Sequence, residues 1–93
     1  MMLKKRLHKK RFKKALWAEQ RDDRKYMVSS LESASLLIGL GKREVIEMLG
    51  DEFNDINSDV WSYYIGTKTF FSYKIFLYIY FNTEGKVFKT VKN

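Results

Sequence analysis

The sequence predicts an α+β fold in which two amino-terminal helices pack on one face of a three-stranded antiparallel sheet. Apolar residues recur at helical spacing up to residue 50, aromatic and β-branched residues dominate after residue 60, and the polar segment 51–59 separates the two regions. A chain of 93 residues has room for one domain. We expect that domain to span residues 15–93, with its elements in the order α, α, β, β, β.

The first helix is expected over residues 22–38. Its amphipathic stripe consists of Met27, Leu31, Ala34 and Ile38, which fall at i, i+4, i+7 and i+11. The two aspartates at positions 22 and 23 suit the amino end of a helix, where the helix dipole is positive. The glycines at positions 39 and 41 then end the pattern.

The second helix is expected over residues 42–49, between two glycines. Val45, Met48 and Leu49 repeat at i, i+3 and i+4, and Gly50 closes the helix. Residues 51–59 are rich in Asp, Asn and Ser, whose side chains compete with regular backbone pairing. This segment is therefore predicted to be a polar loop.

Three strands are predicted, at residues 60–66, 75–81 and 86–92. Residues 82–85 join the last two as a hairpin, because this connection has the length and the final glycine of a four-residue loop. Alternation along the middle strand separates its two faces. The face toward the helices is expected to hold Ile75, Leu77, Ile79 and Phe81, joined by Trp61, Tyr63, Ile65, Val87 and Val91.

The opposite sheet face is expected to carry aromatic rings. Its predicted members are Tyr64, Phe76, Tyr78, Tyr80 and Phe88, together with Thr90. Contiguous exposed rings usually indicate a binding surface. Three interpretations stay open: coverage by the protein itself, through loop 67–74 with Phe70, Phe71 and Tyr73 or through the amino-terminal segment; docking of a partner protein; or stacking of nucleic-acid bases.

The net charge of +7 belongs to the amino terminus, not to the domain. Residues 1–14 are predicted to be a basic, flexible tail, because eight cations and no acid repel one another, whereas residues 15–93 hold ten basic and eleven acidic residues. The tail is a solvated arm, an anchor to anionic lipid, or a phosphate-binding arm for nucleic acid. Its cations are Lys4, Lys5, Arg6, Lys9, Lys10, Arg11, Lys13 and Lys14.

Composition argues against enzymatic chemistry. The chain has no cysteine and no apolar run long enough to cross a membrane, and its one histidine, His8, lies in the tail with no fixed partner. Glu44 and Glu47 share a helix side but are expected to be solvated. We therefore predict a non-enzymatic protein with no catalytic, cofactor-binding or metal-binding residues.

Two short motifs come close to known sites and then fail. Residues 55–59 copy the opening of a calcium loop, but Val60 stands where glycine is required and Gly66 where a bidentate glutamate is required. The segment Gly39-Leu40-Gly41-Lys42 lacks the upstream glycine and the following Ser or Thr of a phosphate-binding loop. These motifs are better explained as turns.

Four blocks in order, residues 37–50, 61–66, 77–81 and 85–87, resemble the SmpA/OmlA (BamE-like) family. Phe12-x4-Trp17 and Arg24-x2-Met27-x3-Leu31 are similar to its small uncharacterised bacterial relatives. Two positions depart from the pattern: Gly41 stands where Ser or Thr usually caps the second helix, and Glu52 where proline is usual. Glycine is an acceptable cap.

The resemblance implies a non-enzymatic adaptor that binds other proteins, related to the bacterial envelope or to outer-membrane protein assembly. It implies an envelope or periplasmic location, whereas the chain shows no signal sequence and no lipid-bearing cysteine, so a cytoplasmic location is the alternative. The alternative function is binding of nucleic acid or anionic membrane through the basic tail. Self-association through an open sheet edge is a further expectation, and the oligomeric state is left open.

Overall fold

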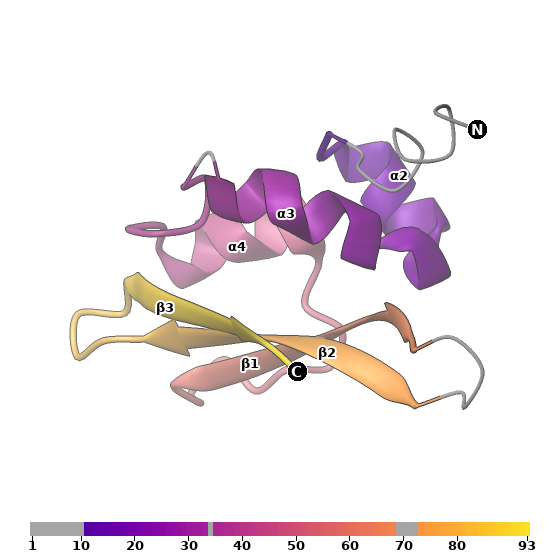
Figure 1. The fold of residues 1–93 in the computed structure, drawn as a ribbon. Helices are drawn as coiled ribbons and strands as arrows, with labels where there is room; N and C mark the ends of the chain where they lie inside the picture. The colour runs from indigo at the N-terminus through magenta and orange to yellow at the C-terminus, as the bar shows by residue number, and fades with distance from the viewer. Residues whose placement is uncertain (1–10, 34, 69–72) are drawn as a thin grey trace, which may run out of the picture.

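The computed structural model describes residues 11–33, 35–68 and 73–93, which fold as helices followed by a three-stranded antiparallel sheet. The helical segments are α2 (Lys14–Glu19), the 3₁₀ helix η1 (Arg21–Asp23), α3 (Lys25–Ser33) and α4 (Lys42–Leu49). The strands are β1 (Val60–Thr67), β2 (Lys74–Phe81) and β3 (Val87–Lys92), in the spatial order β1-β2-β3. The predicted α+β class is confirmed, and Figure 1 shows the helices on one side of the sheet. No helix within these residues is long and apolar enough to cross a membrane.

The first predicted helix is shorter than residues 22–38. Residues 21–23 form η1, and α3 spans only Lys25–Ser33. Met27 and Leu31 of the predicted stripe are buried, and Val28 joins them, whereas Ala34 lies outside the described residues. The apolar pattern therefore located the helix but not its two ends.

The carboxyl end of α3 explains why Ile38 does not extend the stripe. Ser35 takes a left-handed conformation with φ of 51°, and the N–H of Leu36 donates to the carbonyl of Leu31 at 3.0 Å. This is the hydrogen bond of a Schellman ending, after which the chain leaves the helix axis. Ile38 is consequently 51% exposed, and its predicted helical position is wrong.

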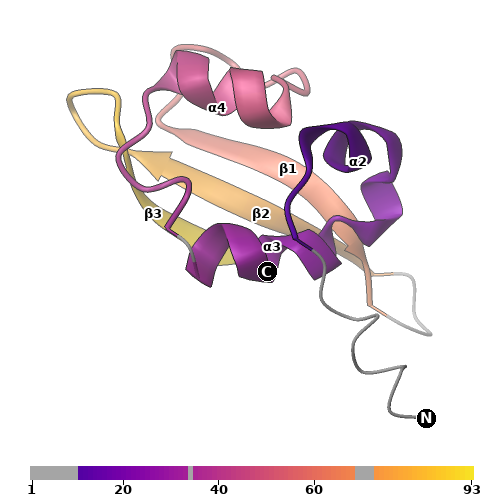
Figure 2. The same cartoon turned by 90° about the horizontal axis from the view of Figure 1, so that it is seen from above.

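Helix α2 is an addition that the sequence pattern does not predict. Six residues are too few for a helix that is stable alone in water, so tertiary contacts hold it. The indole Nε1 of Trp17 donates to the carbonyl of Leu49 at 3.1 Å, and the side chain is buried. Figure 2 shows α2 and α4 on the β1 side of the sheet and α3 on the β3 side.

Helix α4 has the predicted bounds, from Lys42 to Leu49. The N–H of Gly41 donates to Oε1 of Glu44 at 2.7 Å, which satisfies one amide at the helix start. Gly50 ends the helix with φ of 82°, a conformation that glycine adopts without strain. The two glycines that predicted this helix therefore stand at its two caps.

The three predicted strands are confirmed to within one residue at each end. The hairpin turn between β2 and β3 is also confirmed, with Gly85 at φ of 75° and Oδ1 of Asn82 accepting the N–H groups of Glu84 and Lys86. Buried side chains of all three strands face the helices and form one core with them. The strand members of that core are Trp61, Tyr63, Ile65, Leu77, Ile79, Phe81 and Val87.

A β-bulge in β3 reverses the predicted faces of two residues. Val87 pairs with Phe81, but Lys89 pairs with Tyr80, so Phe88 is the extra residue. Beyond the bulge, Thr90 pairs with the buried Ile79 and Val91 with Tyr78. Residues directly opposite each other share a face, so Thr90 lies on the helix side and Val91 on the outer side. Both predicted positions are wrong.

Candidate functional site

The sheet surface opposite the helices brings together the predicted partner-binding residues. Tyr64 pairs with Phe76 across β1 and β2, and their ring centroids are 6.1 Å apart. The ring of Phe76 is 6.2 Å from that of Tyr78. At the other end of the sheet the ring of Tyr80 is 6.4 Å from that of Phe88. We call these five residues, Tyr64, Phe76, Tyr78, Tyr80 and Phe88, the outer aromatic face.

The rings of the outer aromatic face are only partly accessible. Phe88 is 53% exposed, whereas the other four side chains are half-buried. The Tyr64–Phe76 and Tyr80–Phe88 pairs meet edge to face, with interplanar angles of 73° and 65°. This geometry is favourable for aromatic pairs. The rings thus pack as two clusters on one sheet surface, Tyr64–Phe76–Tyr78 and Tyr80–Phe88, more than as separate stacking platforms.

The described part of the amino-terminal segment does not cover this surface. The N–H of Phe12 donates to Oγ of Ser30 on α3 at 2.8 Å, and its ring lies 6.0 Å from that of Trp17. The segment between residue 11 and the start of α2 therefore lies on the helix side of the sheet. Of the proposed covering loop, Tyr73 is 65% exposed, and Phe70 and Phe71 lie outside the described residues.

Positive charge accompanies the outer aromatic face. The three strands contain no Asp or Glu. Lys89 pairs with Tyr80, and its Nζ lies 4.7 Å from the centroid of that ring, within cation–π range. Lys74 lies on the same face as Phe76 by alternation along β2. A binding partner would meet apolar surface with cations on β2 and β3, and with the carboxylates of Asp22 and Glu52 beside Tyr64.

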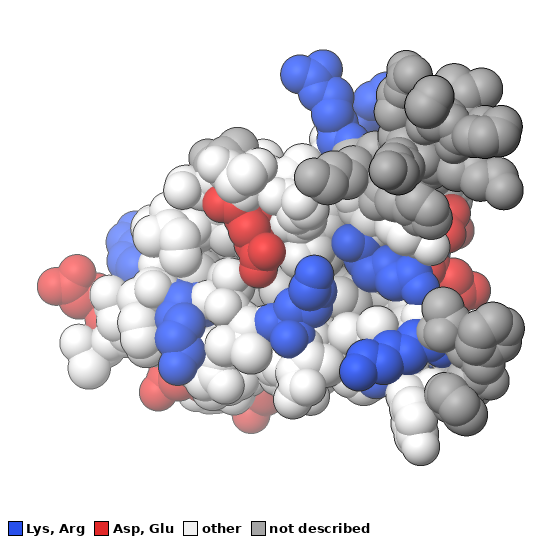
Figure 3. Space-filling model, in the orientation of Figure 1, with Lys and Arg blue, Asp and Glu red and all other residues white. Residues whose placement is uncertain are grey.

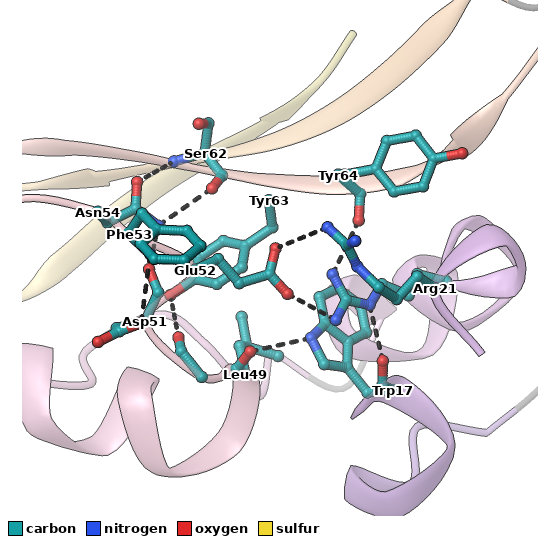
Figure 4. A network of polar contacts seen from close by, with 12 residues as sticks. Trp17, Arg21, Leu49, Asp51, Glu52, Phe53, Asn54, Ser62, Tyr63 and Tyr64 are labelled. Atoms are coloured by element: carbon teal, nitrogen blue, oxygen red, sulfur yellow. Dashed lines mark hydrogen bonds and ion pairs between the residues drawn. The ribbon is translucent and has the colours of Figure 1, made fainter. Parts of the chain in front are cut away.

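Phe53 extends the apolar surface beyond the edge strand β1, and sequence reasoning missed it. It stands in a loop rich in Asp, Asn and Ser, yet its side chain is fully exposed, with φ of 65°. Together with Tyr64 and Phe76 it lines a hollow of about 300 Å³. Figure 4 shows its ring beside Asn54 and Ser62. The sequence holds no signal for its placement, because turn-forming neighbours surround it.

A buried guanidinium, that of Arg24, joins the helical layer to β1. Its Nε donates to the carbonyl of Trp17 at 2.7 Å and its Nη1 to the carbonyl of Tyr64 at 3.0 Å. Nη2 lies 2.6 Å from Oε2 of Glu52, and the guanidinium carbon is 4.5 Å from the Trp17 ring centroid. In the sequence Arg24 stands out only as part of a family resemblance, and no local pattern predicts this network.

The contacts of Arg24 indicate a structural role, in which the guanidinium holds the helical layer against β1. Every polar group of the guanidinium edge described above has a protein partner, and a charge this deeply buried requires such pairing. Beside it, burial and the negative charge of Glu52 raise the pKa of Tyr63, whose hydroxyl donates to the carbonyl of Gly50 at 2.6 Å. A hydrogen bond to Asp22 raises the pKa of Tyr64. Both phenols are thus held in the neutral, donating form.

The other sequence candidates do not converge on a site. Glu44 and Glu47 are exposed on α4, and Glu44 caps its own helix. Oδ1 of Asp55 accepts the N–H of Asn57 at 2.9 Å, which is an ordinary Asx turn. Three tail cations, Arg11, Lys13 and Lys14, are exposed; His8 and the remaining tail cations lie outside the described residues.

No protein-family model matches this chain, and no curated protein or solved structure is significantly similar to it. The likeness to the SmpA/OmlA family therefore stays a prediction from the sequence blocks quoted above. Evidence about function therefore comes from the geometry of the outer aromatic face.

Proposed function

We propose that this protein is a non-enzymatic interaction module that binds another protein through its outer aromatic face. The observation that carries the proposal is the row of five rings on the sheet surface that no helix of the described residues covers. Aromatic residues dominate the energetically important centres of protein interfaces. The finer assignment, an adaptor of the bacterial envelope, has its support in the sequence resemblance alone.

The charges of the face define the partner. Lys74 and Lys89 lie among the rings, and the strands supply no acid. Complementary potentials speed association and reject wrong partners. The partner therefore presents an apolar patch with carboxylates opposite Lys74 and Lys89, and apolar burial supplies most of the affinity. At the other end of the face it meets an acid, because Asp22 accepts the hydrogen bond of the Tyr64 hydroxyl.

The test is capture of a partner from an extract of the source organism by the full chain and by two matched variants. The double variant Tyr78→Ser/Tyr80→Ser removes two rings from the centre of the face and should lose the partner at low and at high salt. Ile56→Ser removes an apolar side chain that is 52% exposed outside the face and should retain it. Affinity for the purified partner then falls at least about 10-fold in the double variant. Equal capture by the double variant and the wild type would exclude this face.

A second candidate function, binding of single-stranded nucleic acid, is favoured by one observation. Lys89 stacks on the ring of Tyr80, and rings with cations and no acids are typical of surfaces that stack bases and hold phosphates. The basic residues 1–14 would add phosphate contacts. The edge-to-face packing of the rings leaves Phe88 as the one mostly exposed ring of the outer aromatic face, which ranks this candidate second.

Titration of a labelled single-stranded oligonucleotide separates the two functions. Nucleic-acid binding must weaken steeply with salt, because each neutralised phosphate releases a counterion. It must also weaken in Lys89→Glu and in Phe88→Ser. Binding that is absent, or that persists in both variants, excludes nucleic acid as the ligand of this face.

A further inference from the structure

The two edges of the sheet are closed to different extents. At the β1 edge, Asn54 bonds both the N–H and the carbonyl of Ser62, at 3.0 and 3.1 Å. Farther along the same edge, Arg24 donates to the carbonyl of Tyr64 and Lys25 to that of Thr67. Side chains thus occupy the backbone groups that another strand would need.

The β3 edge is closed only over its first half. Val87 exchanges hydrogen bonds with the chain before α4, donating to the carbonyl of Leu40 at 2.9 Å and accepting the N–H of Gly39 at 2.8 Å. The second half is different. Asn93 and Phe76 exchange both backbone hydrogen bonds, so antiparallel alternation turns the N–H and carbonyl groups of Lys92 and Thr90 away from β2.

Thr90 and Lys92 therefore present an open template for a strand. Among the described residues, no backbone group bonds to either of them on this side. Figure 1 shows α3 above β3, and Figure 3, in the same orientation, shows lysine and arginine side chains spaced over this face. An extended peptide that pairs with both residues would become a fourth strand.

Two hollows lie on the helix side of this template. Thr90 and Lys92 pair with the inward-facing Ile79 and Leu77, so the side chains of an added strand opposite them would also point toward the helices. Next to Thr90 is a hollow of about 160 Å³, whose lining is mostly apolar and consists of Leu31, Leu37 and Ile38 together with Glu32 and Ser35. Next to Lys92 is one of about 360 Å³, whose lining includes Lys25, Lys68 and Ile75.

The two hollows differ in charge. Three lysines, Lys25, Lys68 and Lys92, line the second one, and within the part of the chain that the structure describes none of them has a carboxylate within ion-pair distance. Nζ of Lys25 donates to the neutral carbonyl of Thr67 and lies 5.3 Å from the Tyr26 ring centroid, so its printed partners carry no negative charge. This hollow suits an acidic side chain, and the first one suits an aliphatic side chain.

We infer that the open edge of β3 binds an extended peptide of another protein, added antiparallel as a fourth strand, with an acidic residue two positions before an aliphatic one. The acidic side chain meets the lysines beside Lys92, and the aliphatic side chain enters the hollow beside Thr90. The antiparallel direction places the acidic residue first, because Lys92 follows Thr90 in the chain. This site is separate from the outer aromatic face and does not depend on the function proposed for it.

The probe is a capped, fluorescein-labelled hexapeptide of sequence TETLTT, titrated against the full chain and followed by anisotropy. Two peptides serve as controls: TKTLTT, and TETLTT with N-methyl groups on its glutamate and leucine. Methylation removes the donors that must reach the edge and leaves the charge unchanged. The proposal predicts about 10-fold or weaker binding for each control.

Substitutions in the protein test the same contacts between the peptide and the β3 edge. Lys92→Glu should weaken TETLTT about 10-fold, whereas Lys86→Glu, the same charge change at the exposed far end of the hairpin, should not. Thr90→Pro removes an N–H that points away from β2, so the edge loses a donor while the ladder keeps its bonds. In the wild-type complex, hydrogen exchange of the Thr90 and Lys92 amides should slow at least about 10-fold.

Three results would overturn the inference. The first is equal binding of TETLTT and either control peptide, since strand addition needs both the charge and the backbone donors. The second is no binding of TETLTT at millimolar concentration. The third is self-association of the full chain that Thr90→Pro abolishes and TETLTT does not reverse, because the occupant of the edge would then be a second copy of this protein.

Discussion

Arg24 and Glu52 form an ion pair of 2.6 Å that joins the start of α3 to the loop before β1. Glu52 reaches the guanidinium from a backbone with φ of 44°. Proline is fixed near φ of −65° and could not stand there. Position 52 therefore requires a residue other than proline, and its carboxylate balances a buried charge.

Removal of this buried cation should be far more damaging than removal of its exposed neighbour. Arg24→Ala would leave Glu52 without its close partner and the carbonyls of Trp17 and Tyr64 without donors, which should lower the free energy of unfolding by about 3–5 kcal/mol. Arg21 is exposed and lies 3.8 Å from the same carboxylate, so Arg21→Ala should cost less than about 1 kcal/mol. Urea unfolding followed by tryptophan fluorescence measures both values. Equal losses would show that the network is not a structural support.

The approach of η1 to β1 requires glycine at position 66. A Cβ atom there would lie 2.8 Å from the carbonyl oxygen of Asp22, and the φ of 137° is unfavourable for other residues. We expect Gly66→Ala to lower the free energy of unfolding by about 2 kcal/mol or more, from strain and from the clash. Gly85→Ala is the matched control, because Gly85 also has positive φ but open space around it. Its cost should stay near 1 kcal/mol, and a larger cost at Gly85 would refute the close-approach argument.

Sequence periodicity was sufficient where an element has a regular pattern. The apolar run of β2 alternates over its whole length, and this placed the rings of Phe76, Tyr78 and Tyr80 on one face. The pattern failed in β3, because no glycine or proline marks the bulge at Phe88, and a shift of one residue moves Thr90 and Val91 to opposite faces. Bulges of this kind depend on the neighbouring strand, which local spacing does not encode.

The polar contacts were harder to predict than the apolar ones. Arg24 meets Glu52 and the carbonyl of Tyr64 only after the sheet and helices have packed, and these residues lie far apart in the chain. The free backbone groups of Thr90 and Lys92 were likewise unpredictable, because they depend on where the chain before α4 meets β3. Asn54 sits in a loop whose composition indicates a turn, and nothing in that composition indicates a cap on a strand edge.

Stability should fall at alkaline pH through Tyr63. Its buried hydroxyl has a pKa raised above the ordinary value of about 10, chiefly by desolvation. The unfolded chain therefore releases this proton first, so the stabilisation is complete below about pH 10 and decreases as pH rises toward the folded-state pKa. Tyr63→Phe should make the alkaline loss shallower by up to about 1.4 kcal/mol per pH unit. Urea unfolding at about pH 9, 10 and 11 measures both slopes, and identical slopes would contradict this assignment.

The same substitution has an expected cost at neutral pH. The Tyr63 hydroxyl is the donor to the carbonyl of Gly50 at the end of α4. Tyr63→Phe leaves that acceptor without this donor and should lower the free energy of unfolding by about 1–3 kcal/mol. A neutral-pH stability equal to the wild type would show that water replaces the hydroxyl without loss.

Asn54 should protect the β1 edge from self-association. Its amide occupies both the N–H and the carbonyl of Ser62, as a neighbouring strand would. Asn54→Ala frees both groups, so we expect a loss of about 1–3 kcal/mol in unfolding free energy and a concentration-dependent shift to dimers in sedimentation velocity. Asn54→Asp keeps the acceptor for the Ser62 N–H but loses the donor, so it should lie between the wild type and Asn54→Ala in both measurements. A monomeric Asn54→Ala variant at all concentrations would mean that the twist of β1 or its neighbouring side chains, and not this amide, keep the edge closed.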